Sequence, residues 1–217
     1  MFETVIFDLD GVITDTAKYH YLAWKKITDE IGVTFDEKVN ERLKGVDRIH
    51  SLEIILKNTG PHFSEAEKRR IADEKNEYYQ RFVATITPED LLPGARNVLE
   101  ILKANGIKIG LASASKNAPT VIEKLQIGEF FDFMADAAKI KRGKPDSEIF
   151  LTVAENLQTE AKKCIGVEDA IAGIRAIKAA GMYAVGIGDP QVLKEADEVI
   201  KGLDEFNTDK YLRGSCL

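Results

Sequence analysis

The stretch TVIFDLDGVIT, residues 4–14, decides the fold, because it joins a short apolar run to a loop that carries two acids. Residues 4–7 are rich in β-favouring side chains, and Asp8, Asp10 and Gly11 follow them. This pattern predicts a buried strand that ends in a loop. Residues two apart in an extended strand face the same side, so Asp8 and Asp10 are expected to point into one crevice.

A helical region follows this first strand. From residue 17 to about residue 84, apolar residues recur at helical spacing, and we find no convincing strand signal among them. Turn residues at Gly32, Gly45 and 59–61 divide the region into about four helices. These helices are expected to form a small unit of their own.

Strands and helices then alternate to the end of the chain. The signals predict helices near residues 95–105, 120–125, 149–157 and 170–180, and strands at residues 108–112, near Phe133, and at 164–167, 183–187 and 199–200. The order predicts an α/β fold with a doubly wound, Rossmann-like parallel sheet and an inserted helical cap. We assign residues 1–15 and 88–217 to the core and 16–87 to the cap, with linkers near 14–16 and 86–88.

Composition limits the classes of partner. With 217 residues, 44% hydrophobic and 30% charged, the chain is expected to fold as a globular protein. The formal net charge is −6 and the basic residues are scattered, which argues against a nucleic-acid surface. Cys164 and Cys216 fit neither a metal site nor a disulfide framework. We expect a cytoplasmic monomer that acts on small molecules and not on a membrane.

Two pairs of acids follow two different predicted strands. Besides Asp8 and Asp10, the pair Glu168-Asp169 follows the apolar run at 164–167. Asp169 alone would be explained equally well as a helix cap. Four acids at two strand ends instead favour a hard cation bound by oxygen ligands, which suits Mg²⁺.

Two further polar residues lie near predicted strand ends or turns. Ser113 follows the strand at 108–112, where its hydroxyl and backbone amides could hold a phosphate. Considered alone, it is more often a turn former. Lys144 precedes Pro145, which favours an extended or turn conformation before the next helix, although most lysines are solvated surface charges.

These motifs together resemble the haloacid dehalogenase superfamily. Four motifs occur in that superfamily's order and span residues 8–169: DLDGVIT, Ser113, Lys144 before Pro145, and Glu168-Asp169. Four further segments are similar to those of the phosphoglucomutase branch of this superfamily: DLDGVITDTAKYHYLAW, LKGVDR, the pair Lys75-Asn76, and LASASKN. Residues 47–50 and 142–143 depart from that pattern.

The resemblance implies roles for the core residues. Asp8 would be the nucleophile that forms an aspartyl phosphate, and Asp10 the general acid and base. Ser113 and Lys144 would hold the transferring phosphoryl oxygens. The implied Mg²⁺ ligands are Asp8, Asp10 through its backbone carbonyl, Glu168 and Asp169.

The resemblance also implies a sugar-phosphate site shared by cap and core. Its candidate residues are His20, Trp24, Lys44, Gly45, Val46, Arg48, Ser51, Lys75, Ser115, Lys116 and Asn117. Without the resemblance, Arg48 and Lys116 would be interpreted as solvated side chains, and His20 as a packing or surface residue.

Three functions remain open. The first is interconversion of β-D-glucose 1-phosphate and glucose 6-phosphate through bound β-glucose 1,6-bisphosphate, as the resemblance implies. The second is a magnesium-dependent sugar-phosphate phosphatase, because the core motifs serve water and sugar acceptors equally. The third is a non-catalytic phosphoacceptor module, against which the cap and Asp10 both argue.

Overall fold

The core of the protein is a six-stranded parallel sheet. The computed structural model describes residues 1–43, 46–57 and 62–212. The strands run in the order β3-β2-β1-β4-β5-β6 and are all parallel. Their bounds are β1 Thr4–Phe7, β2 Lys108–Leu111, β3 Phe133–Met134, β4 Cys164–Glu168, β5 Tyr183–Ile187 and β6 Glu198–Ile200. The predicted parallel sheet is therefore confirmed, with β1 at its centre.

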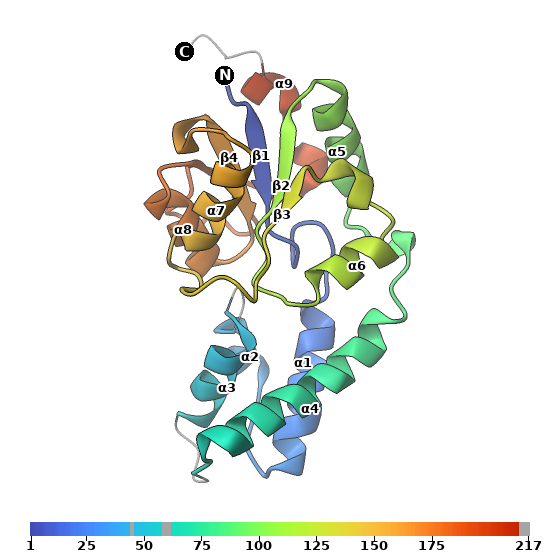
Figure 1. Ribbon diagram of the computed structural model, residues 1–217, viewed down its shortest axis with the longest axis vertical. Helices are drawn as coiled ribbons and strands as arrows, with labels where there is room; N and C mark the ends of the chain where they lie inside the picture. The colour runs from blue at the N-terminus through green and yellow to red at the C-terminus, as the bar shows by residue number, and fades with distance from the viewer. Residues whose placement is uncertain (44–45, 58–61, 213–217) are drawn as a thin grey trace.

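Helices cover both faces of this sheet (Figure 1). Alternate residues of β1 point to opposite faces, so Val5 and Phe7 belong to one apolar cluster and Ile6 to another. The first cluster includes the apolar faces of α5 (Ala95–Ala104) and α6 (Ala118–Lys124), with α9 (Thr208–Leu212) close by. The second includes α7 (Glu148–Asn156) and α8 (Ile171–Ala179). Helices on both faces make the sheet doubly wound, as predicted.

Four helices between β1 and β2 pack around an apolar cluster of their own. They are α1 (Ala17–Glu30), α2 (Glu37–Glu41), α3 (Arg48–Leu56) and α4 (Glu65–Val83). Their shared cluster contains Trp24, Ile27, Leu52, Ile55 and Ile71. Figure 1 shows them beyond the carboxyl ends of the strands, at the end of the molecule away from both termini. Of the predicted breaks, Gly45 and residues 59–61 lie outside the described residues.

The two connections between the helical unit and the sheet run side by side. The Thr14 hydroxyl donates to the backbone oxygen of Asp90 at 2.7 Å, and Thr14 also forms an isolated antiparallel bridge with Leu91. A capping box sets where the long helix α4 begins. The Ser64 hydroxyl accepts from the Glu67 amide, and the Glu67 carboxylate accepts from the Ser64 amide.

The predicted element bounds differ from the structure by one or two residues. The clearest difference is β4, which continues through Glu168, because Glu168 still pairs with Gly186 of β5. Glu168 is therefore the last strand residue, and Asp169 is the first residue of the loop. Within the described ranges, none of the helices combines the length and hydrophobicity needed to cross a bilayer.

Candidate functional site

Three acids meet at the carboxyl end of the two central strands. Asp8 follows β1, Glu168 ends β4 and Asp169 comes next, and one oxygen of each lies within 4.8 Å of the others. A set of carboxylate oxygens is what a hard divalent cation requires. The Asp10 side chain is not part of this group, so its predicted contribution is limited to the backbone carbonyl.

Two glycines make room for this acidic group. Gly11 has φ +75°, and a Cβ there would lie 2.2 Å from Oδ2 of Asp169. A Cβ on Gly173 of α8 would lie 2.0 Å from the carboxyl carbon of Glu168. Both distances are shorter than any real contact, so the absence of a side chain at each position allows the acids to approach the strand ends.

Lys144 offsets part of this acidic charge. Its Nζ donates to Oδ1 of Asp8 at 2.6 Å and to Oε2 of Glu168 at 2.7 Å, and its ammonium-bearing side chain is fully buried. Burial alone would lower the pKa of Lys144, but the charges of Asp8 and Glu168 outweigh it and raise that pKa above its usual value. Lys144 is therefore a fixed positive charge beside Asp8.

Asp10 lies next to Asp8 but in a different environment. Its backbone amide donates to Oδ2 of Asp8 at 3.0 Å, while its own Oδ1 accepts from the Thr16 hydroxyl. Burial and the nearby Asp8 charge raise the pKa of Asp10 to about 7. A carboxyl group with such a pKa can hold or release a proton near neutrality, as a general acid and base requires.

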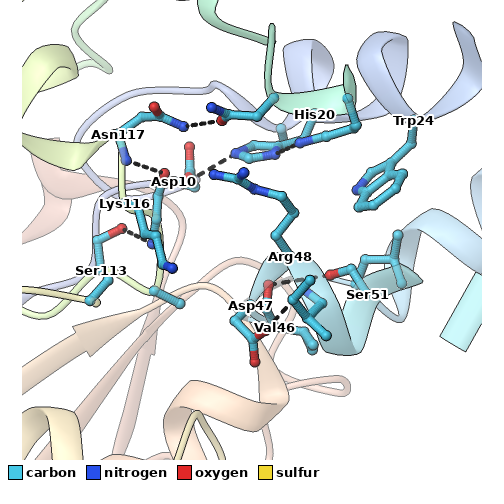
Figure 2. Close-up of a pocket in the computed structure, with 18 of the residues that line it drawn as sticks. Asp10, His20, Trp24, Val46, Asp47, Arg48, Ser51, Ser113, Lys116 and Asn117 are labelled. Atoms are coloured by element: carbon cyan, nitrogen blue, oxygen red, sulfur yellow. Dashed lines mark hydrogen bonds and ion pairs between the residues drawn. The ribbon is translucent and has the colours of Figure 1, made fainter. Parts of the chain in front are cut away.

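The cap places His20 and Lys75 near Asp10. Lys75 is buried, and its Nζ lies 2.7 Å from Nδ1 of His20, while Nε2 of His20 lies 3.9 Å from Oδ2 of Asp10 (Figure 2). Burial, together with the neighbouring Lys75 and Arg48 charges, lowers the pKa of His20 well below its usual value. His20 is therefore a neutral ring whose Nε2 faces Asp10.

Aromatic rings enclose this pair of cap residues. The His20 ring stacks on Tyr79 with centroids 4.0 Å apart, and Nζ of Lys75 lies 5.1 Å from the Trp24 ring centroid. Burial, with the added effect of Arg48, lowers the pKa of Lys75 to about 7. Trp24 therefore belongs both to the cap cluster and to the wall of the cleft.

Loop 113–117 of the core forms the opposite wall. The Ser113 hydroxyl accepts from the Ser115 amide at 3.2 Å, and the Ser115 hydroxyl accepts from the Asn117 amide at 3.3 Å. These successive turns direct the loop along the edge of the cleft, where Lys116 is exposed. Loop 113–117 therefore presents hydroxyls and one cation to whatever occupies the cleft.

The start of α3 closes the cleft on the cap side. Nη1 of Arg48 lies 3.4 Å from Oδ1 of Asp73, and the Ser51 hydroxyl lies 3.4 Å from the Val46 carbonyl oxygen. Figure 2 shows the Arg48 side chain extending into the cleft toward His20 and Asp10. The predicted residues Lys44 and Gly45 lie outside the described part of the chain.

The structure therefore gathers the predicted residues that it describes around one cleft. The exceptions are Lys144 and Glu168, which are buried and do not line the cleft. Lys144 is joined to it by its hydrogen bond to Asp8, which does line it. Sequence reasoning missed Thr16, Tyr79 and Asp73. Of these, Tyr79 had a detectable signal, because it lies four residues after Lys75 and so on the same helix face. Thr16 lies in the predicted linker at 14–16, yet its hydroxyl donates to the Asp10 carboxylate and makes no helix cap.

The whole chain is similar to known proteins. Residues 2–181 match the family model of haloacid dehalogenase-like hydrolases. The chain is 50% identical over 201 residues to a β-phosphoglucomutase of Bacillus subtilis, covering 92% of this chain and 89% of that protein. It is 33% identical over 205 residues to a phosphorylated carbohydrates phosphatase of Thermotoga maritima, covering 91% and 92%. A crystal structure of β-phosphoglucomutase from Clostridium difficile matches with a TM-score of 0.95 and 48% identity over 98% of both chains.

Proposed function

Because the chain belongs to the haloacid dehalogenase-like hydrolase family, we propose that it is a β-phosphoglucomutase that interconverts β-D-glucose 1-phosphate and glucose 6-phosphate. The family resemblance expected from the sequence is thereby confirmed. The proposal names β-glucose 1,6-bisphosphate as the bound intermediate and Mg²⁺ as the divalent metal. Residues 16–87 act in it as the cap.

One observation carries the choice of a mutase. The same cleft is lined at the sheet edge by Asp8 and Asp10, on the cap side by Arg48, and on loop 113–117 by Lys116. A bisphosphate needs two anion sites at once, one for the transferring group and one for the distal group. Arg48 and Lys116 supply positive charge for the second site, and arginine binds phosphate oxygens in a bidentate manner.

Phosphoryl transfer follows from the positions of Asp8 and Asp10. An oxygen of Asp8 attacks phosphorus, the bond from phosphorus to the sugar oxygen breaks, and Asp10 gives its proton to that oxygen. In the second half of the reaction Asp10 takes a proton from the free hydroxyl of a bound sugar monophosphate. That oxygen attacks the phosphorus on Asp8, and the bond from phosphorus to Asp8 breaks, which regenerates the carboxylate. The pKa of Asp10 of about 7 suits both directions.

Fixed positive groups offset the negative charge of Asp8 and the phosphoryl group. Lys144 holds Oδ1 of Asp8 in place at 2.6 Å and offsets negative charge at the attacked phosphorus. Asp8, the Asp10 carbonyl, Glu168 and Asp169 would hold Mg²⁺, which when bound lowers the repulsion between carboxylate and phosphate. Ser113 and its neighbouring amides are available to the phosphoryl oxygens.

The test supplies purified protein with Mg²⁺, β-glucose 1-phosphate and a trace of glucose 1,6-bisphosphate, and measures glucose 6-phosphate and free phosphate together. The proposal expects rapid glucose 6-phosphate formation with little free phosphate. Free phosphate without isomerised product would instead establish the phosphatase, the second candidate, which the 33% identity to the Thermotoga maritima phosphatase favours.

A further inference from the structure

Helix α4 turns one face toward the core, and this face carries two pairs of side chains. Lys75 and Tyr79 form one pair and Asn76 and Gln80 the other, and each pair is separated by four residues, about one helical turn. Lys75 and Tyr79 contact His20 and Thr16, as the hydrogen bonds of both side chains show. Asn76 and Gln80 have no place in the chemistry described above.

Both residues of the second pair bond to Asn117 of the core. Nδ2 of Asn117 donates to Oδ1 of Asn76 at 2.8 Å, and Nε2 of Gln80 donates to Oδ1 of Asn117 at 3.4 Å (Figure 2 shows Asn117 at the edge of the cleft). The amide of Asn117 thus donates to one cap residue and accepts from another. Asn117 stands just before α6 but makes no side-chain cap there, so its amide is available for these bonds.

Asn117 is also part of the wall that faces the substrate. Its backbone amide donates to the Ser115 hydroxyl at 3.3 Å, and the Ser115 amide donates to the Ser113 hydroxyl at 3.2 Å. The contact of Asn76 and Gln80 with Asn117 therefore joins the cap to loop 113–117. We call these three residues the amide clasp.

We propose that Asn76 and Gln80 are positioning residues that hold the cap against loop 113–117 through Asn117, and thereby determine whether the phosphoryl group on Asp8 passes to a sugar hydroxyl or to water. This inference rests on the proposed phosphoryl transfer through Asp8. The physical reason is that an aspartyl phosphate hydrolyses when water reaches it, and a cap held closed excludes water.

The size of the effect follows from the two bonds. A net contribution of about 0.5 to 1.5 kcal/mol for each hydrogen bond corresponds to roughly a two- to twelve-fold change in the equilibrium between open and closed cap. The bond to Asn76 is short and partly buried, whereas the bond to Gln80 is long and exposed. Asn76 is therefore expected to contribute more than Gln80.

The experiment compares the wild type with the double variant Asn76→Ala/Gln80→Ala and with the control Glu77→Ala. Glu77 lies between the two clasp residues on α4 and is exposed. Alanine is a good helix former, so neither variant is expected to lose α4. Two quantities are measured: the ratio of free phosphate to glucose 6-phosphate at steady state, and the rate at which phosphorylated enzyme hydrolyses without sugar.

We expect both quantities to rise roughly five- to ten-fold in the double variant and to stay within two-fold of wild type in the control. Amide hydrogen exchange at residues 113–117 should be faster in the double variant as well. If both products fall together at an unchanged ratio, or if hydrolysis stays within two-fold of wild type, the clasp has no such role. If wild type forms no glucose 6-phosphate, the mutase proposal fails, while the hydrolysis rates still test the clasp.

Discussion

Replacing Lys144 by methionine is expected to destabilise the fold as well as the chemistry. The wild-type Nζ makes two charge-assisted hydrogen bonds, to Asp8 at 2.6 Å and to Glu168 at 2.7 Å. Methionine fills a similar space but offers no donor. The variant would leave Asp8 and Glu168 as neighbouring buried carboxylates with no compensating charge from residue 144.

The magnitude follows from the burial of all three side chains. Exposed fractions of 0%, 7% and 0% for Lys144, Asp8 and Glu168 place the group away from solvent screening. Removing one partner from a buried ion pair costs about 3 to 5 kcal/mol. For a chain of this size, each kcal/mol shifts the melting temperature by about 2 to 4 °C, so the loss should be on the order of 10 °C.

The assay is thermal unfolding in EDTA, with Lys141→Met as the matched control. Lys141 is exposed on the same loop, so its replacement should change stability by no more than about 0.5 kcal/mol. Turnover of the Lys144 variant should fall by roughly two to three orders of magnitude, because a fixed charge at the attacked group is lost. A Lys144→Met protein as stable as the control would refute the assigned ion pairs.

Further predictions concern Gly11, His50 and the metal. Gly11→Ala should cost about 1 to 2 kcal/mol of stability, because the backbone there is left-handed. It should also weaken Mg²⁺ binding roughly ten-fold, because a Cβ 2.2 Å from Asp169 displaces that ligand. Calorimetric titration with Mg²⁺ measures the change in affinity. The hydrogen bond to Asp47 raises the pKa of His50 above 6.5, so its stabilising effect should be present below that pH and disappear as pH rises through the raised pKa. Because the His50 side chain is 65% exposed, the stability gap between wild type and His50→Gln should stay below about 1 kcal/mol at pH values below 6.5. The gap should shrink as the pH rises through the raised pKa, and a gap that does not change with pH would contradict the pairing. EDTA should abolish turnover and Mg²⁺ should restore it, whereas activity that survives complete chelation would rule out a metal role.

Most of the fold could be predicted from local pattern. The apolar runs at β1, β4 and β5 are buried on both faces, so they are continuous in the sequence and easy to find. The end of β4 was less predictable, because Glu168 is a charged residue that continues the strand only through its pairing with β5. A charge beside an apolar run normally indicates a strand end.

The core of the site could be predicted because its residues follow strand ends. Parallel strands bring Asp8, Ser113 and Asp169 to one edge wherever the helices lie. The cap contacts could not be predicted in the same way. Lys75 meets His20 across 55 residues of sequence and Arg48 meets Asp73 across 25, so both contacts depend on how α1, α3 and α4 pack together. A one-dimensional pattern contains no signal for such pairs, except where spacing places Tyr79 on the face of Lys75.

The most direct test of the central claim follows a radioactive phosphoryl group through Asp8. Enzyme with Mg²⁺ is mixed with labelled β-glucose 1,6-bisphosphate, quenched within one turnover and digested for peptide mapping, and a second sample is chased with unlabelled β-glucose 1-phosphate. We predict label on the peptide that carries Asp8, its transfer to sugar phosphate during the chase, and no label on the Asp8→Asn protein. Turnover to glucose 6-phosphate without label on that peptide would contradict the account.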